Sequence, residues 1–298
     1  MTRRMGVVSM VLLLMIAPWA IGQTRMLIVS TCSEGSHRIQ DAINAAADGG
    51  IVVIEPGIYR ENLEICRPAT ILGQEGVILE PETQDRPAMT VDQAVGVSIY
   101  GVQIRNAAVG IDVSVSSCLI ADCTIRASKI GVRIMTFADD LVSLCSTVVH
   151  GEGFGVSVLG SGTTALSICE FDGLATGASI GGIALVSVSG CTFERCYDGL
   201  VIASAATAIL ADNLIGSNHG SGVRLDASPG GAEEGSLALL RNTIEANGRW
   251  GLSLCGVNGM TGVELFGQIL GWENQFADNG LGATCPVDLP LPEAFFGE

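Results

Sequence analysis

Basic residues are scarce in this sequence. Lysine and arginine together number 15 against 31 aspartates and glutamates, so the formal net charge at pH 7 is −16. A surface this acidic repels nucleic acid and anionic membranes, which excludes both as partners. It also repels acidic polysaccharides such as polyuronates unless a divalent cation bridges the two.

Long apolar runs are also lacking. The apolar run over residues 7–20 follows Arg3 and Arg4 and is short for a membrane span, which needs ~20 residues. It ends at Ala20-Ile21-Gly22, which places small residues at the −3 and −1 positions of a cleavage site. This layout predicts a secretory signal peptide over residues 1–22, with an uncleaved anchor as the alternative. We therefore expect a secreted, periplasmic or cell-surface protein with no membrane span once the signal is removed.

Prolines and aromatic residues are few, whereas glycine occurs 39 times, a composition that indicates a regular, turn-rich fold. Carbohydrate-binding platforms favour exposed aromatic rings, and only a few are present. Trp250 and Trp272 lie near the C-terminal end and are the candidates for a carbohydrate contact. Packing under long loops is the alternative role of these two side chains.

Cys-x-x-Cys pairs are absent, although the chain has ten cysteines. Cysteines in an exported protein usually form disulfides. Several of these, however, fall at equivalent points of the repeat described below, where a buried thiol packs as a small apolar residue. Stacked free thiols and disulfides both remain open. The candidate bridges join Cys32 to Cys66 and Cys255 to Cys285.

Recognisable catalytic and cofactor motifs are missing as well. The sequence has no Gly-x-Ser-x-Gly elbow, no nucleotide-binding loop and no histidine or cysteine spacing typical of zinc or copper. No cofactor is therefore evident. Asp139 and Asp140, in a predicted corner, are candidate Ca²⁺ ligands, since Ca²⁺ takes carboxylate and carbonyl oxygens. A solvated turn is the alternative for this pair.

What the chain does have is a repeat near 22 residues, which begins at residue 102. Each repeat carries a small or polar residue, an apolar residue two places later, and then a glycine followed by alternating apolar residues. The first position is occupied by Val102, Cys123, Thr147, Cys169, Cys191, Asn213, Asn242 and Asn274. The glycines are Gly110, Gly131, Gly155, Gly177, Gly199, Gly222 and Gly251.

This repeat predicts a solenoid. Alternating apolar residues mark short strands with one buried face, and 22 residues are too few for a strand plus a crossover helix. Each repeat would instead form one coil that buries its inner face against the next. Glycine would allow a tight corner or a close backbone approach, and the three asparagines would stack into an internal amide ladder. The expected fold is all-β, a single-stranded right-handed parallel β-helix over residues 51–284.

Both ends of the predicted solenoid need a cover, because an uncapped coil exposes bare strand edges. Residues 23–50 form an N-terminal segment in which Ile39, Ala42, Ile43 and Ala46 lie on one helical stripe. We expect this helix to cap the first coil. The tail over residues 285–298 either covers the last coil or hangs free, and an uncovered coil would be a route to self-association.

Three segments resemble the opening of pectin-lyase-like right-handed parallel β-helix proteins. They are Ile39-Gln40-x-Ala42-Ile43, the run Gly50–Gly57 with Tyr59 and Glu61 after it, and Ala69-Thr70-Ile71-Leu72-Gly73. This superfamily includes pectate lyases, polygalacturonases, pectin methylesterases, alginate epimerases and the NosD-type accessory protein of nitrous oxide reductase. The resemblance implies the fold but not the activity, because members share coils and differ in their sites. The Asp-Pro-His-Glu stretch of the epimerases and the basic constellation of pectate lyases are not found.

One row of titratable residues stands five places before the corner glycines. It contains Arg105, Arg126, His150, Asp172 and Glu194, and then Ser217. Equivalent positions on neighbouring coils lie ~4.8 Å apart, so these side chains would form a continuous line. His150, Asp172 and Glu194 are the candidate catalytic or metal-binding group, and the two arginines are candidate binding residues. An exposed ion-pair ladder that keeps the strands in register is the structural alternative.

These observations favour a non-catalytic exported scaffold that binds a polysaccharide or protein ligand on its lateral face. The first alternative is a polysaccharide lyase or hydrolase that uses the His150, Asp172 and Glu194 row. The second is a NosD-type accessory role in copper delivery, although no cluster of Met or His ligands is visible. The sequence leaves the ligand and the oligomeric state open.

Overall fold

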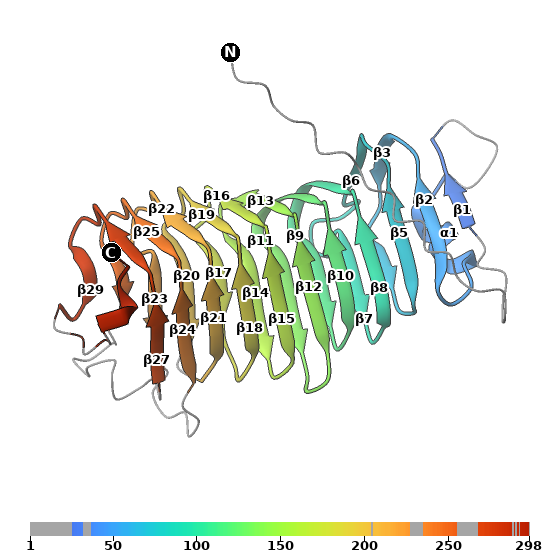
Figure 1. Cartoon of the computed structure of the whole chain (residues 1–298). Helices are drawn as coiled ribbons and strands as arrows, with labels where there is room; N and C mark the ends of the chain where they lie inside the picture. The colour runs from blue at the N-terminus through green and yellow to red at the C-terminus, as the bar shows by residue number, and fades with distance from the viewer. Residues whose placement is uncertain are drawn as a thin grey trace, which may run out of the picture.

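The computed structural model describes residues 26–31, 37–203, 205–226, 235–254, 268–287, 289, 291 and 293–297. The chain winds into one long right-handed parallel β-helix, as Figure 1 shows, which confirms the predicted fold. Helical structure in the described part is limited to the helix α1 (Ile39–Ala45) and the 3₁₀ turn η2 (Glu293–Phe295). No helix of this part is long and apolar enough to cross a bilayer.

One face of the solenoid is a parallel sheet of eleven strands, here called sheet A, in which each coil contributes one strand. The strands lie side by side along the length of the molecule (Figure 1). They are β1 (Met26–Val29), β2 (Gly50–Ile54), β5 (Ala69–Gly73), β8 (Val95–Tyr100), β10 (Ser117–Ala121), β12 (Leu141–Cys145), β15 (Thr163–Ser167), β18 (Leu185–Ser189), β21 (Thr207–Ala211), β24 (Ser236–Leu240) and β27 (Gln268–Trp272).

The other strands form sheet B, which consists of two parallel ladders that meet at a corner. The first ladder contains β3 (Gly57–Arg60), β6 (Val77–Glu80), β13 (Val148–Gly151), β16 (Glu170–Asp172), β19 (Thr192–Glu194), β22 (Leu214–Gly216), β25 (Thr243–Glu245) and β28 (Gln275–Ala277). The second contains β4 (Leu63–Ile65), β7 (Met89–Asp92), β14 (Phe154–Gly160), β17 (Thr176–Ile180), β20 (Asp198–Ala203), β23 (Val223–Asp226), β26 (Trp250–Ser253) and β29 (Gly282–Cys285). The long strands β9 (Gln103–Ser114) and β11 (Thr124–Thr136) belong to both ladders because their backbones stay extended through the corner.

The predicted register between coils is confirmed. Phe171 pairs with Phe193 and Asp172 with Glu194 on neighbouring strands, and the two phenylalanine rings stack with centroids 4.7 Å apart. Inside the coil, the backbone N–H of Cys169 points to the Sγ of Cys191 at 3.4 Å. Apolar side chains of successive coils therefore stack on one another and fill the interior.

The corner glycines also form a column, and close approach of backbones explains it. A Cβ built on Gly177 would lie 2.5 Å from the ring of Phe193 and 2.6 Å from the carbonyl oxygen of Gly199. No real Cβ tolerates either distance. Any larger residue at this position would push two coils apart.

Two amide ladders run through the interior, of which the sequence analysis predicted one. In the first ladder, Asn213 donates from Nδ2 to the Oδ1 of Asn242 at 2.9 Å, and Asn242 donates in the same way to Asn274 at 3.0 Å. The second ladder, which was missed, is built in the same way at distances of 2.9 Å from Asn218, Asn247 and Asn279. Its signal was present in the sequence, because each member lies five residues after a member of the first ladder.

Both ends of the solenoid are covered by side chains of the described chain. At the N-terminal end, Ile39 and Ile43 of α1 are buried, and the carboxylate of Glu61 accepts the N–H groups of Ile39 and Gln40. Sheet A starts earlier than the predicted boundary at residue 51, because β1 precedes α1 and pairs with β2. At the other end, Phe295 is fully buried against Gly271, so the C-terminal segment covers the last coil.

The cysteines largely follow the free-thiol alternative. Cys66 is a free, exposed thiol, which corrects the predicted bridge to Cys32: it follows the alternating buried residues of β4 and points outward. Cys285 is disulfide-bonded. Cys32, Cys255 and the predicted signal peptide lie outside the described residues. Six further cysteines are free, and burial raises the pKa of Cys118 to about 12.

Candidate functional site

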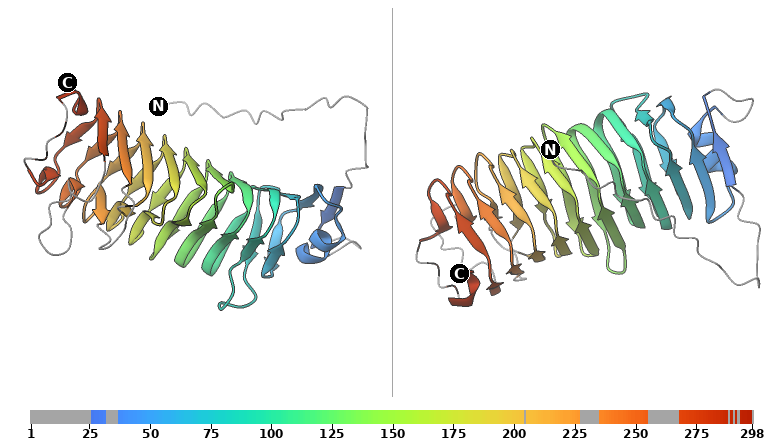
Figure 2. Two further views of the ribbon diagram at one scale, coloured as in Figure 1. Left: turned by 90° about the horizontal axis from the view of Figure 1, so that it is seen from below. Right: turned by 45° about the horizontal axis from the view of Figure 1, so that its top comes forward.

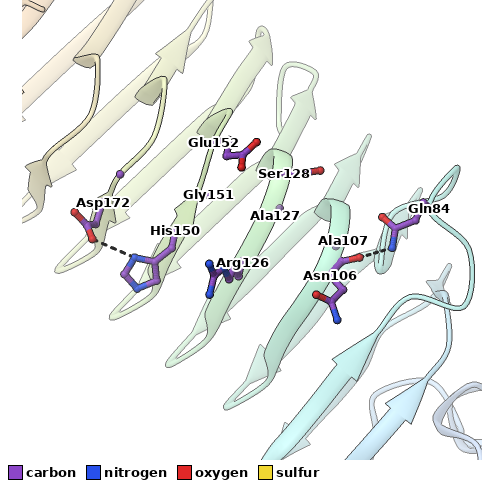
Figure 3. A pocket seen from close by; sticks show the side chains of 11 residues that line it. Gln84, Asn106, Ala107, Arg126, Ala127, Ser128, His150, Gly151, Glu152 and Asp172 are labelled. Atoms are coloured by element: carbon purple, nitrogen blue, oxygen red, sulfur yellow. Dashed lines mark hydrogen bonds and ion pairs between the residues drawn. The ribbon is translucent and has the colours of Figure 1, made fainter. Parts of the chain in front are cut away.

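A groove of about 790 Å³ lies on the lateral face, along the corner between the two ladders of sheet B. Four neighbouring coils contribute to its floor, so it runs parallel to the solenoid axis. Figure 3 shows its lining side chains, which include three residues of the predicted row. The lining residues are Gln84, Asn106, Ala107, Arg126, Ala127, Ser128, His150, Gly151, Glu152, Asp172 and Gly173.

Arg126, His150 and Asp172 stand side by side on successive coils. Arg126 of β11 pairs with His150 of β13, which in turn pairs with Asp172 of β16. His150 Nδ1 lies 3.5 Å from Asp172 Oδ2, and 38% of the His150 side chain is exposed. The side chain of His150 also lines the groove. Two members of the predicted catalytic group, His150 and Asp172, thus lie beside the predicted binding residue Arg126, whereas the third member, Glu194, is not part of the groove lining.

Asp172 is held from its other side by Arg195, a residue that the sequence analysis missed. Arg195 Nε lies 2.7 Å from Asp172 Oδ1, and a weaker contact of 3.8 Å joins its NH1 to Glu194. Arg195 follows β19 in the left-handed conformation, with φ 54°, and this turns its side chain back toward the preceding coil. The hydrogen bond and the charge of Asp172 raise the pKa of Arg195, so the guanidinium stays protonated.

Among the described residues, Arg126 lacks the ion pair that Arg133 makes on the same strand. Arg133, on the same strand, makes a two-pronged contact with Asp112 of the neighbouring coil, at 2.8 and 2.5 Å. Arg126 has no carboxylate within ion-pair distance in the part of the chain that the structure describes. Its guanidinium is thus a positive charge that opens onto the groove.

The ends of the predicted row lie outside the groove lining. Arg105 contacts Gln103 through its guanidinium at 3.0 Å, and Glu194 faces Arg195. The expected sixth member, Ser217, is wrong: Gly216 pairs with Glu194, and Glu245 follows it. The corner of that coil is one residue longer, so counting back from Gly222 misses the position by one.

One end of the groove is walled by the loop over residues 81–88 between β6 and β7, which projects from the solenoid (Figure 2, left). Asn62 anchors the loop by donating from Nδ2 to the carbonyl oxygens of Thr83 and Pro87, at 3.1 and 2.8 Å. Gln84 donates from its side-chain amide to the backbone oxygen of Asn106. The sequence analysis did not identify this loop, because the readable repeat begins only at residue 102.

Trp250 and Trp272 lie away from this groove and from a common site. Trp250, on β26, is half-buried. Trp272 ends β27 in sheet A, is 54% exposed, and lines a separate groove with Arg241 and Phe296. Of the two, Trp272 is the more exposed.

The candidate Ca²⁺ ligands Asp139 and Asp140 lie in the turn before β12. Asp140 Oδ2 accepts the backbone N–H of Phe137 at 2.9 Å, which is the bond of a turn-capping carboxylate. Within the described ranges, no group of three or more His, Cys, Asp or Glu side chains is placed to hold a metal ion. The turn role accounts for Asp140.

Comparison with known proteins agrees with this architecture. A family model for the right-handed β-helix region matches residues 143–270. A search of curated proteins found no match.

Solved structures with the same coil architecture are similar over most of the chain. An alginate lyase from Paenibacillus sp. str. FPU-7 superposes with a TM-score of 0.66 at 14% identity, covering 87% of this chain and 98% of the lyase. A pectate lyase gives 0.65 at 12% identity, with 87% and 77% covered. A polygalacturonase from Erwinia carotovora ssp. carotovora gives 0.55 at 10% identity, with 94% and 97% covered. At these identities the likeness shows the fold alone, and this chain is accordingly a right-handed parallel β-helix protein with the pectin-lyase-like fold.

Proposed function

We propose that the protein is exported and binds a polysaccharide chain in the groove along sheet B, without cleaving it. The observation that carries this proposal is the Arg126 guanidinium, which opens onto the groove with no described carboxylate in ion-pair distance. Arg126 is exposed to solvent, so its guanidinium is free to form charge-assisted hydrogen bonds with the oxygens of a ligand.

The shape of the groove suits an extended chain. Four coils spaced ~4.8 Å apart give it a floor of roughly 14 Å, which fits a short run of sugar units. Side chains that hydrogen-bond hydroxyl groups lie along this floor: Ser128, His150 and Glu152, with Gln84 at the loop end. Rigid strands hold most of them, so the ligand meets a preformed surface.

The negative charge of the protein limits which polysaccharides the groove can bind. The chain has a net charge of −16, and Asp172 and Glu152 lie at one end of the groove. A polymer with a carboxylate on every unit would be repelled by this field. A neutral or sparsely acidic polysaccharide would not, and Arg126 could pair with its occasional acidic group.

The ion pairs of Asp172 support a binding role over a catalytic one. A general base needs an accessible carboxylate, whereas Asp172 lies between Arg195 and His150. The similar alginate lyase, pectate lyase and polygalacturonase carry names of carbohydrate-active proteins, which adds support for a saccharide ligand.

A binding screen with matched variants tests the proposal. The purified protein is titrated with neutral and acidic oligosaccharides, with and without Ca²⁺, by calorimetry. We expect Arg126→Ala to weaken binding by about tenfold or more, since charge-assisted hydrogen bonds contribute ~1.5–3 kcal/mol. Arg133→Ala removes an equal charge from the neighbouring face and should bind as the wild type does. Equal losses in both variants, or no binding to any saccharide, would refute the groove as a saccharide site.

Catalysis is the second candidate, and the His150–Asp172 contact favours it. An imidazole held by a carboxylate at Nδ1 can take up or release a proton at Nε2, and the His150 side chain lines the groove. The same oligosaccharides, incubated with the protein and analysed for new chain ends, decide between the two roles. Cleavage that is lost in His150→Ala but kept in Arg133→Ala would establish an enzyme; intact oligosaccharides that still bind would establish the scaffold.

A further inference from the structure

The outer face of sheet A carries no charge. None of the residues in its eleven strands is Asp, Glu, Lys, Arg or His, although the chain as a whole has a net charge of −16. Charged residues begin directly beyond the strand ends, with Asp140 on one side and Asp122, Asp212 and Glu273 on the other. The result is an uncharged strip with a charged rim, which is the anatomy of a protein interface.

The strip also exposes many apolar side chains. Nine of its large apolar side chains are between 40% and 66% exposed, and they are Met26, Ile28, Leu72, Val95, Leu141, Leu185, Ile209, Leu270 and Trp272. Large exposed apolar patches on soluble proteins usually meet a partner, so nine such side chains on one uncharged face point to an interface.

We propose that this face binds sheet A of a second copy of the chain, as a face-to-face dimer. Two strongly acidic chains repel each other through most of their surfaces, and the repulsion is weakest where neither carries a charge. Charge therefore selects this face for contact between like chains. Sheets that pack face to face do so ~10 Å apart, and side chains of modest size allow this spacing.

The distribution of side-chain size fits a two-fold arrangement. Large exposed side chains stand at both ends of the strip, with Met26 and Ile28 at one end and Leu270 and Trp272 at the other. Further ones lie between the ends, on β8, β12 and β18. The central outward positions of the middle coils hold small side chains, Ser143, Ala165 and Ser187. A two-fold axis through the middle strands would place each large end against the opposite large end of the partner, and the small centre against itself.

The outer face of sheet A is large enough for a stable dimer interface. Eleven strands at ~4.8 Å spacing cover roughly 50 Å, and five residues at ~3.3 Å span roughly 16 Å, which gives roughly 800 Å² per partner. Stable interfaces of standard size bury about this area on each side. Because the groove lies on sheet B, the dimer would leave both grooves open.

Sedimentation velocity over a wide range of protein concentration, with variants that add one charge, tests this proposal. Ser143→Asp places two carboxylates near the two-fold axis, and we expect it to weaken dimerisation by about tenfold or more, since facing like charges oppose association. Ser179→Asp adds the same charge to β17 on sheet B and should leave the dimer intact. Circular dichroism confirms that both variants fold.

The sedimentation results distinguish the proposed dimer from the alternatives. A dimer that is weakened only by Ser143→Asp supports the proposal. A monomer at all concentrations, a dimer that Ser143→Asp does not weaken, or a dimer weakened equally by Ser179→Asp overturns it. Open-ended oligomers would also overturn it, because the free edge of β1 rather than the face would then be the contact.

Discussion

The coils in the C-terminal part and those in the middle of the solenoid use different residues at the same inward-facing position. After sheet A, each coil turns inward at a position that is Asn213, Asn242 or Asn274 in the C-terminal part and Cys169 or Cys191 in the middle. In both parts the side chain accepts a backbone N–H from the preceding coil. The Oδ1 of Asn213 receives the N–H of Cys191 at 2.9 Å, whereas the Sγ of Cys191 receives that of Cys169 at 3.4 Å.

The difference lies in what else the side chain can do. An asparagine also donates: Nδ2 of Asn242 reaches the carbonyl oxygen of Leu210 at 2.8 Å and Oδ1 of Asn274 at 3.0 Å. A thiol is a weak donor and a weak acceptor, and Cys191 donates only to the nearby Ser189 carbonyl. The asparagine coils are therefore joined by a continuous amide network, whereas the cysteine coils rely more on apolar packing.

The largest effect is expected from breaking the amide network. Asn242→Ala would leave the backbone N–H of Asn213 and the carbonyl of Leu210 without these buried partners, at ~1–3 kcal/mol each. We expect a loss of about 4 kcal/mol, measured by urea denaturation, against roughly 1–2 kcal/mol for Cys191→Ala. Equal losses in the two variants would show that the ladder adds nothing beyond packing.

A pH dependence should mark the cysteine coils alone. Burial raises the pKa of Cys196 to about 11 from 9.0. Below about pH 9 the Cys196 thiol is protonated in both the folded and the unfolded protein. Above that pH it ionises first in the unfolded protein, so its contribution to the free energy of unfolding falls by ~1.4 kcal/mol per pH unit until about pH 11.

The variant Cys196→Asn places the ladder residue in this position and removes one titrating group. Between pH 7 and pH 10 it should lose ~1.4 kcal/mol less than the wild type. The deficit of Asn242→Ala should be the same at both pH values, because an amide does not titrate. An identical alkaline loss in wild type and Cys196→Asn would contradict this explanation.

A smaller gain is expected from extending the first ladder into the middle coils. In Cys191→Asn, Oδ1 would accept the N–H of Cys169, and Nδ2 would reach the Leu166 carbonyl, which corresponds in register to the Val188 carbonyl bound by Asn213. One added buried hydrogen bond predicts about 1 kcal/mol of stabilisation, seen as a higher thermal midpoint. A lower midpoint would mean that the cysteine coils lack room for the amide.

The smallest effect on stability is expected from removing the surface arginine Arg195. Arg195 precedes Cys196 but lies on the surface, and its ion pair with Asp172 is solvated. Arg195→Ala should leave the thermal midpoint nearly unchanged, because exposed ion pairs contribute little to folding. A drop comparable to that of Cys191→Ala would place this ion pair among the main supports of the fold.

Much of the fold could be predicted because the period is regular. The glycine column, the stacking of Phe171 on Phe193 and the first amide ladder all depend on residues that recur at one interval. The error at Ser217 came from counting back from the corner glycine. Glu194 lies three residues after Cys191, and the same count forward from Asn213 reaches the correct residue, Gly216. The second ladder was readable in the same way and was missed.

The candidate site was only partly predictable. Arg126, His150 and Asp172 are neighbours because of the register, which the period reveals. The contact of Arg195 depends on a left-handed turn that aims its side chain back by one coil, and no spacing rule indicates it. Gln84 comes from a loop in coils where the repeat is too irregular to align.

The buried cap at Phe295 makes the solenoid resemble a polymer with a chain terminator. Each coil offers the next a parallel strand edge of the same kind, so the repeat itself does not fix how many coils are added. Phe295 ends the series by blocking the space beside Gly271 and by accepting the last amide of the ladder, that of Asn274, at 3.1 Å. The cap, and not the repeating unit, thus sets where the stack of coils stops. Coils inserted or deleted in the middle would leave the packing of Phe295 on the last coil unchanged.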